Sequence, residues 1–262
     1  MWRSQIRPSS NGTGSSKAQI MPALADDQLV RLWEVGEDRH PVDRALLLLL
    51  AADPQATLDD VAQLTIGQRN YRLLQLRAGT FGPRLAAAAA CPGCGEQLHF
   101  SIHVDDLAQP RPERAHGRLI VDGFEVDYRL PDSRDLAAIV GLDVIIAARE
   151  LLLERCVVAV QAAVPTEATS PAPAELLKAV AAAIDERDPM ADIWLELACP
   201  NCDHEWEAQF DVVSYLWREV GDRAQRLMYD VSRLAAVYGW SESQVLALGP
   251  TRRQRYLELA GQ

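Results

Sequence analysis

The sequence lacks any apolar stretch long enough to cross a membrane. A membrane-spanning helix needs about 20 consecutive apolar residues. The longest candidate, residues 140–164, is interrupted by the charged side chains Asp143, Arg149, Glu150, Glu154 and Arg155. Residues 1–17 also lack the apolar core of a signal peptide. We therefore expect a cytoplasmic protein without a membrane span.

An excess of basic charge is also missing. The 262 residues contain 26 Lys and Arg against 37 Asp and Glu, which gives a net charge of -11 and a pI of about 4.9. The phosphate backbone of a nucleic acid repels such a chain. A hydrophobic content of 48% is ordinary for a folded protein. Composition thus predicts an acidic globular protein and disfavours nucleic acid as a partner.

Motifs of common enzyme classes are absent as well. The chain has no glycine-rich phosphate loop, no Gly-x-Ser-x-Gly elbow, no His-Glu-x-x-His motif and no Rossmann fingerprint. His99 and His103 share the polar face of a predicted strand and could join a metal site, although surface histidines are commoner there. We find no residues that support catalysis and predict that the protein is not an enzyme.

Five cysteines are present, and four of them form two similar pairs. The first pair is Cys91-Pro-Gly-Cys94, and the second, about a hundred residues later, is Cys199-Pro-Asn-Cys202. Alternating apolar residues follow each pair, namely Leu98, Phe100, Ile102 and Val104 after the first and Trp206, Ala208, Phe210 and Val212 after the second. This alternation predicts strands, so each pair should lie at the tip of a β-hairpin.

A Cys-Pro-x-Cys turn directs two thiolates toward one point, whereas zinc takes four ligands in a tetrahedron. Neither pair completes such a site alone. We therefore predict that the two hairpins lie together and that Cys91, Cys94, Cys199 and Cys202 bind one Zn²⁺. A catalytic zinc keeps one position open for water, and four cysteines leave none, so this zinc would be structural. Disulfides, or hairpins without metal, are the alternatives.

The fifth cysteine, Cys156, lies among Leu153, Val157 and Val158 on a predicted helix. Because it is unpaired and surrounded by aliphatic residues, we predict that it fills core rather than acts as a nucleophile. Four cysteines in chelating pairs fit a reducing compartment better than a disulfide scaffold.

Helical spacing of apolar residues occupies most of the remaining chain. Predicted helices begin near Asp26, Pro41, Thr57, Thr65, Ser133, Leu176, Tyr215, Ser241 and Thr251. The helix from Ser133 is predicted to run through Val160 with one break at Gly141. Arginines at 69, 72 and 77 are predicted to lie on a solvated face, although they could also bind an acidic partner. In the last helix, arginines 252, 253 and 255 are predicted outside and Leu259 inside.

Strand patterns surround the first cysteine pair. The run Ala86 to Ala90 leads into Cys91 and is predicted to be an inner strand, because small side chains permit close packing. Residues 119–121 and 124–128 flank Asp122-Gly123, which predicts a second hairpin with a tight turn.

These patterns predict an α+β fold that is mainly helical, with two Cys-knuckle β-hairpins in a zinc-ribbon-like unit and an extra hairpin. The predicted segments are a disordered arm (1–20), a helical segment (21–84), the first Cys-knuckle hairpin with the Asp-Gly hairpin (85–130), a helical insertion (131–192), the second Cys-knuckle hairpin (193–213) and a C-terminal helical segment (214–262).

Several short motifs together resemble one protein family. They are Leu64-Thr-Ile-Gly-Gln-Arg-Asn70 with Leu73-Leu74, Cys91-Pro-Gly-Cys94-Gly-Glu96, Arg129-Leu-Pro131 with Asp135-Leu136, Asp188-Pro189 before Cys199-Pro-Asn-Cys202, Phe210-Asp211 with Leu216-Trp217, Tyr238-Gly-Trp-Ser-Glu242 with Val245-Leu246, and Arg252-Arg253 with Tyr256-Leu257. The chain resembles, over residues 22–260, baseplate proteins related to T-even-type hub and hub-assembly components of contractile phage tails and tail-like contractile injection systems. Asn70 and Gly249 depart from the pattern, at positions where an acidic residue and Ser are expected.

This resemblance implies a structural or assembly role in a baseplate, with other baseplate or tail proteins as partners and no catalysis. The alternative is a zinc-ribbon module that binds nucleic acid or regulates another protein. The acidic charge argues against nucleic acid.

Overall fold

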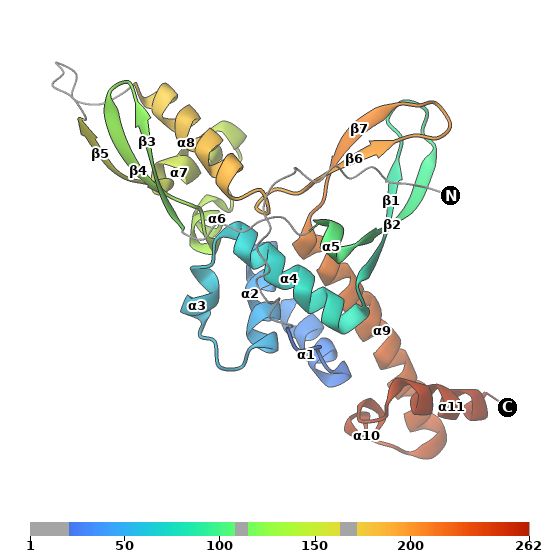
Figure 1. Ribbon diagram of the computed structural model, residues 1–262. Helices are drawn as coiled ribbons and strands as arrows, with labels where there is room; N and C mark the ends of the chain where they lie inside the picture. The colour runs from blue at the N-terminus through green and yellow to red at the C-terminus, as the bar shows by residue number, and fades with distance from the viewer. Residues whose placement is uncertain (1–20, 108–114, 163–171, 262) are drawn as a thin grey trace. The chain divides into compact units, whose positions relative to one another are not determined.

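The computed structural model describes residues 21–107, 115–162 and 172–261 (Figure 1). Within these ranges the protein is mainly helical and has three small antiparallel sheets, which confirms the predicted α+β class. The arm predicted over residues 1–20 lies outside the described residues. None of the described helices is long and apolar enough to cross a membrane.

The chain divides into two compact units, and each is built from separate stretches of sequence. One unit comprises the described parts of residues 19–56, 73–82 and 212–262, and the other comprises residues 57–72 and 83–211. We refer to them as the helical unit and the hairpin unit. The division of the chain into six consecutive segments, which we expect from the sequence, stays a prediction.

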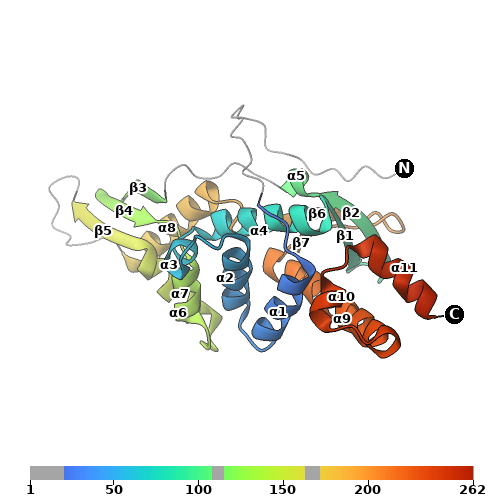
Figure 2. The same ribbon diagram turned by 90° about the horizontal axis from the view of Figure 1, so that it is seen from below.

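The helical unit is organised around one long helix. Its elements are α1 (Asp26–Gly36), α2 (Pro41–Ala52), the second half of α4 (Ile66–Phe81), α9 (Val212–Tyr238), α10 (Glu242–Leu246) and α11 (Pro250–Ala260). Leucines from α1, α2 and α9 form its core, including Leu29, Leu48 and Leu216. Helices α10 and α11 pack at the end of α9 (Figure 2). At Gly36 an added Cβ would meet the Trp217 ring at 2.2 Å, so α1 requires glycine there.

Arg253 is buried in this unit, which contradicts the prediction that it lies outside. Its guanidinium is 2% exposed and lies 2.6 Å from a carboxylate oxygen of Asp26 and 3.2 Å from one of Asp230. Arg223 also contacts Asp26, at 2.9 Å. The prediction for Leu259 is wrong as well, because this side chain is 58% exposed. The ion pairs orient α11 with its arginine inward and turn Leu259 to the surface.

Arg69 and Arg77 on α4 are buried too, contrary to the predicted solvated face. In the helical unit, two guanidinium nitrogens of Arg77 lie 2.9 and 2.7 Å from the carboxylate of Glu219. In the hairpin unit, Arg69 donates to the Asn70 side-chain oxygen at 3.1 Å. Burial lowers the pKa of Arg69 to about 10. Paired or hydrogen-bonded arginines can enter a core that an isolated charge cannot.

The hairpin unit contains all the described strands. They are β1 (Arg84–Ala90), β2 (Gln97–His103), β3 (His116–Val121), β4 (Phe124–Arg129), β5 (Val157–Ala162), β6 (Trp194–Ala198) and β7 (Glu205–Gln209). Its helices are α3 (Leu58–Ala62), the start of α4, α5 (Val104–Leu107), α6 (Ser133–Ile139), α7 (Ile145–Cys156) and α8 (Pro173–Arg187). Sheet pairings are β1–β2, β3–β4–β5 and β6–β7, all antiparallel.

One strand prediction and one helix prediction need correction. The alanine run lies on β1, but among the described residues β1 pairs only with β2, in a two-stranded sheet, and is not an inner strand there. The predicted helix from Ser133 breaks at Gly141, whose φ is +83°, but it ends at Cys156 rather than Val160. Residues 157–162 form β5, in which Val160 pairs with Val126 of β4. Its β-branched valines favour a strand wherever a neighbouring strand is available.

The predicted Asp122-Gly123 hairpin is confirmed as β3–β4. Both turn residues have positive φ, 50° and 82°, as a two-residue hairpin turn requires. After β4, Asp135 at the start of α6 is fully buried and contacts Arg129 at 2.7 Å and Arg155 at 2.9 Å. Burial acts to raise the pKa of Asp135, but hydrogen bonds from Arg129 and the Asp132 backbone lower the pKa overall. These contacts tie α6 to β4 and α7.

Replacing Arg253 with methionine should destabilise the protein by about 3 kcal/mol, because Asp26 and Asp230 would keep partly buried charges without this partner. The matched control is Arg255→Met in the same helix. Arg255 is 78% exposed in its ion pair with Glu258, so its loss should cost no more than about 0.5 kcal/mol. Urea unfolding of both variants measures the difference, and equal midpoints would contradict the buried network.

Candidate metal centre

Two knuckles with the same backbone hydrogen bonds carry the paired cysteines. In the first, between β1 and β2, the Cys91 N–H donates to the Glu96 carbonyl and the Gly95 N–H donates to the Cys91 carbonyl, both at 2.8 Å. In the second, between β6 and β7, Cys199 donates to His204 and Asp203 donates to Cys199, both at 2.9 Å. The two turns therefore share one local fold.

The residues between and after the cysteines explain this fold. Pro92 and Pro200 fix the backbone directly after the first cysteine of each pair, where a turn favours proline. The residue after the second cysteine adopts a positive φ, which is 76° at Gly95 and 56° at Asp203. Glycine, and to a lesser degree Asp, tolerates this conformation. Each short motif thus closes its own turn.

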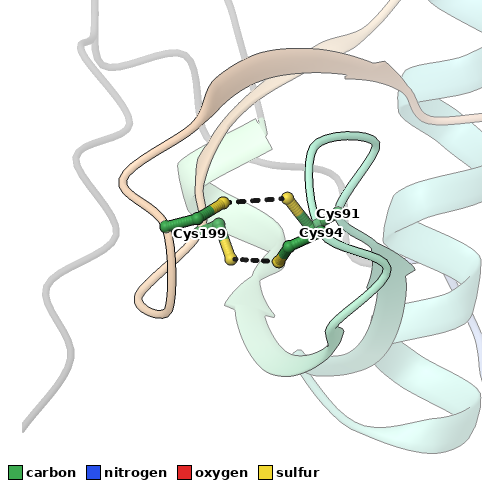
Figure 3. Close-up of side chains that lie close together, drawn as sticks. Cys91, Cys94 and Cys199 are labelled. Atoms are coloured by element: carbon green, nitrogen blue, oxygen red, sulfur yellow. Dashed lines mark hydrogen bonds between the residues drawn. The ribbon is translucent and has the colours of Figure 1, made fainter.

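The structure brings the four predicted sulfurs together (Figure 3). All lie within 4.8 Å of one another. The shortest separations join opposite hairpins, with Cys91 Sγ 3.7 Å from Cys202 Sγ and Cys94 Sγ 3.6 Å from Cys199 Sγ. The prediction that the two hairpins meet at their cysteines is confirmed, although β1–β2 and β6–β7 remain separate sheets.

These separations distinguish a metal site from disulfides. A disulfide requires about 2.05 Å between sulfurs, so the cysteines here are free thiols. Zinc–sulfur bonds of about 2.3 Å in a tetrahedron place sulfurs about 3.8 Å apart. The Sγ–Sγ separations of 3.6 and 3.7 Å between the two hairpins agree with that spacing. Cys91 and Cys199 are buried, whereas Cys94 and Cys202 are exposed. The donor set therefore fits Zn²⁺, and metal binding itself stays a prediction.

The electrostatics of the four thiols also favour a cation. Two hydrogen bonds lower the pKa of Cys94 to about 7. The larger effect comes from the Glu96 backbone N–H and the smaller one from the side-chain amide of Asn201. At Cys202 the His204 backbone favours the thiolate, but the Cys94 sulfur, burial and the other cysteines raise the pKa to about 12. Several thiolates cannot share so small a space without a compensating positive charge.

Other side chains near the knuckles take packing roles. His204 packs against Gly93, where an added Cβ would meet the imidazole at 3.1 Å, and it stacks on Trp206 with ring centroids 6.0 Å apart. His99 and His103 are not among the clustered ligand atoms in the described ranges. The Asn201 contact to Cys94 was not predicted, although its place inside the second Cys-Pro-x-Cys motif was a usable signal.

A buried clasp holds the chain just before the second hairpin. The Asp188 carboxylate accepts a hydrogen bond from the Gly67 N–H, 3.0 Å away, at the start of α4. At Gly67 an added Cβ would meet Asp188 at 1.8 Å, so only glycine fits. Asn70 donates to the carbonyl of Met190 at 2.9 Å. Burial raises the pKa of Asp188 despite these polar neighbours. Sequence reasoning singled out these residues as motif positions but did not predict their contacts.

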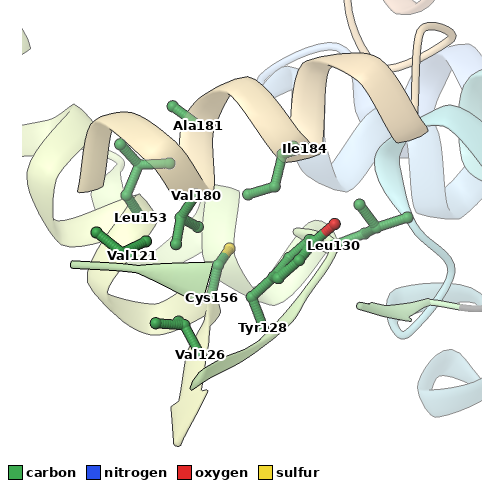
Figure 4. Close-up of a cluster of buried hydrophobic side chains, with 9 residues drawn as sticks. All are labelled: Val121, Val126, Tyr128, Leu130, Leu153, Cys156, Val180, Ala181 and Ile184. Atoms are coloured by element: carbon green, nitrogen blue, oxygen red, sulfur yellow. The ribbon is translucent and has the colours of Figure 1, made fainter. Parts of the chain in front are cut away.

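Cys156 lies apart from the metal centre, in the core beneath the three-stranded sheet (Figure 4). It is fully buried with Val126 and Tyr128 of β4, Leu153 of α7 and Val180 of α8. Burial raises the pKa of the thiol to about 11. The prediction that Cys156 fills core is confirmed, because a buried, protonated thiol is a poor nucleophile.

The paired knuckles, their clasp and the α+β fold define a chain in which distant segments converge on one thiol cluster. A sequence model described as T4 bacteriophage base plate protein matches residues 44–216, which include both knuckles, and the chain belongs to this family. The match confirms the resemblance to phage baseplate proteins seen in the sequence. No curated protein and no solved structure matches the chain.

The first knuckle should depend on glycine at position 95. Gly95→Ala is expected to destabilise the protein by about 1–2 kcal/mol, because an alanine at φ +76° is strained. Nothing lies within 4 Å of the added methyl, so packing does not contribute. Gly221→Ala is the control, because Gly221 lies inside α9, where alanine is favoured, and an added Cβ would make only an ordinary contact with the Trp33 ring at 3.5 Å. Thermal unfolding compares the two, and a neutral Gly95→Ala would contradict the left-handed turn.

Proposed function

We propose that this protein is a structural or assembly component of the baseplate of a contractile, phage-tail-like injection system, and that its four paired cysteines hold a structural Zn²⁺. The observation that supports this most directly is the family match, which spans both knuckles. The convergence of four sulfurs within 4.8 Å adds the chemistry of the site.

In this proposal the zinc acts on shape rather than on a substrate. Zn²⁺ supplies the positive charge that four sulfurs require, and with Cys91, Cys94, Cys199 and Cys202 as ligands it keeps no position for water. It would fix two hairpins whose sheets share no strand. We therefore propose a non-enzymatic role, in which the rigid hairpin pair and the helical unit present surfaces to other subunits.

The partners would be other baseplate or tail proteins, and the resemblance of the sequence to hub and hub-assembly components favours the centre of the baseplate. The protein would join the particle in the cytoplasm, where contractile tails are assembled. Nucleic acid is not proposed as a partner. The exposed face of β6–β7 carries Glu196, Glu205 and Glu207, with Glu196 directly opposite Glu207, and this face repels phosphate.

Metal analysis of the full chain, purified under reducing conditions, should find about one zinc ion per chain. Cys94→Ser and Cys202→Ser should lose this zinc and unfold at lower temperature, because structural zinc binding contributes directly to folding free energy. Cys156→Ser is the matched control. It should keep the zinc and cost about 1–2 kcal/mol for a buried hydroxyl. Zinc-free wild-type protein, or equal melting of all three variants, would rule out the structural zinc.

The baseplate role is tested in the native host with a tagged chain. Sheath-containing particles and their assembly intermediates are separated by sedimentation, and each fraction is analysed by mass spectrometry and cryo-electron microscopy. We expect the chain in at least one of the two fractions, and Cys94→Ser should reduce its amount there while Cys156→Ser does not. Absence of the wild-type chain from both fractions would overturn the role.

A further inference from the structure

An exposed aliphatic run joins α6 to α7. Residues 140–147 are all exposed, and Asp143 is the one charged residue among them. The most exposed are Val144 at 60%, Ile145 at 83% and Ile146 at 70%. Val140, Leu142 and Leu151 are also exposed. Large aliphatic side chains gathered on a surface mark an interaction site more often than singly scattered ones do.

The run has a defined conformation. Gly141 adopts φ +83°, the Leu142 N–H donates to the Ile139 carbonyl at 3.2 Å, and the Ala148 N–H donates to the Val144 carbonyl at 3.0 Å. The other end of α7 buries Leu153 and Cys156 in the core of the unit. The buried contacts of Asp135 fix α6 and α7 on either side of the run. The aliphatic side chains are therefore presented on a braced turn, and ordering them on binding costs little.

The charges around the run are arranged for self-pairing. Asp143 precedes Ile146 by three residues, and Arg149 follows Ile146 by three. Neither has an ion-pair partner in the described part of the chain. In a two-fold dimer, residue i of one copy contacts residue j of the other and the reverse. With the axis at Ile146 and the α7 helices antiparallel, Asp143 of each copy faces Arg149 of the other.

We propose that residues 140–151 bind a second copy of this chain in a two-fold dimer, with Ile145 and Ile146 at the centre and two Asp143–Arg149 ion pairs at the sides. The aliphatic side chains lose their water and supply the affinity, whereas the ion pairs fix the antiparallel arrangement. A surface of residues 140–151 is smaller than the roughly 20–30 residues that each partner contributes to a stable interface, so the dimer should form reversibly. The proposal does not depend on the baseplate role.

Analytical ultracentrifugation of the full chain under reducing conditions, from about 5 to about 500 μM, tests the proposal. The mass should rise with concentration from 28.9 kDa toward twice that value. Ile145→Glu should keep the protein monomeric over the whole range. Ile120→Glu is the matched control, because Ile120 is 72% exposed on β3 and lies outside the run, and it should leave the equilibrium unchanged. Thermal unfolding should be the same for both variants.

A charge swap tests the two-fold arrangement itself. Asp143→Arg alone and Arg149→Asp alone each place like charges opposite one another, so each should weaken dimerisation about tenfold. The double variant restores both pairs and should recover the wild-type dimer. A monomer at every concentration, a larger oligomer, a dimer that survives Ile145→Glu, or a double variant no better than the single ones would overturn the proposal. If residues 140–151 bind only a different subunit, the chain should stay monomeric at every concentration, which is the first of these outcomes.

Discussion

In the hairpin unit, four sulfurs from two distant turns meet within 4.8 Å of one another. A two-stranded hairpin alone is at best marginally stable in water, and in the part of the chain that the structure describes neither β1–β2 nor β6–β7 gains a third strand. Their tips nevertheless bring Cys91 within 3.7 Å of Cys202 and Cys94 within 3.6 Å of Cys199. At Cys202 the His204 backbone favours the thiolate, but the Cys94 sulfur, burial and the other cysteines raise the pKa to about 12, whereas hydrogen bonds lower the pKa of Cys94 to about 7. The arrangement therefore favours a cation that converts the repulsion into four bonds.

The clasp at Asp188 complements the sulfur cluster from the other end of the second hairpin. Gly67 and Asn70 at the start of α4 bind residues 188–190, just before β6. One end of this hairpin is thus held by hydrogen bonds between side chains and backbone, and the other end carries two of the four clustered thiols. The clasp also gives a physical reason for Asn70 as it stands here: its amide nitrogen donates to the Met190 carbonyl, and an ionised carboxylate at this position would have no proton to donate.

Features encoded within a few residues were predictable from the sequence. The cysteine turns, the Asp122-Gly123 hairpin and the break at Gly141 each follow from a local motif, and the structure contains all three. The repetition of one turn motif also allowed the meeting of the two hairpins to be predicted. Strand β5 was missed because Val157 follows α7 without a turn residue, and its partner β4 lies outside any local window.

The buried arginines were missed for the same reason. Arg253 is 227 residues from Asp26, and Arg77 is 142 residues from Glu219. Because these partners lie outside any local window, the local pattern of charges predicts a solvated helix face. Helical periodicity shows which residues share one side of a helix. It does not show whether an arginine is buried or solvated, because that depends on an acidic partner far away in the sequence. In the candidate site, the four cysteines that cluster could be named from their spacing, whereas the Asn201 and Asp188 contacts required the three-dimensional structure.

The long interval between the two knuckles has a consequence for synthesis on the ribosome. The first knuckle leaves the ribosome with only half of the thiol cluster, and its partner pair is translated about a hundred residues later. At about 5–20 residues per second, this delay lasts roughly 5–20 s. During that interval the β3–β4–β5 sheet and α8, which have a core of their own, can fold as an independent module. Closure of the cluster would then mark a nascent chain whose second knuckle has been translated.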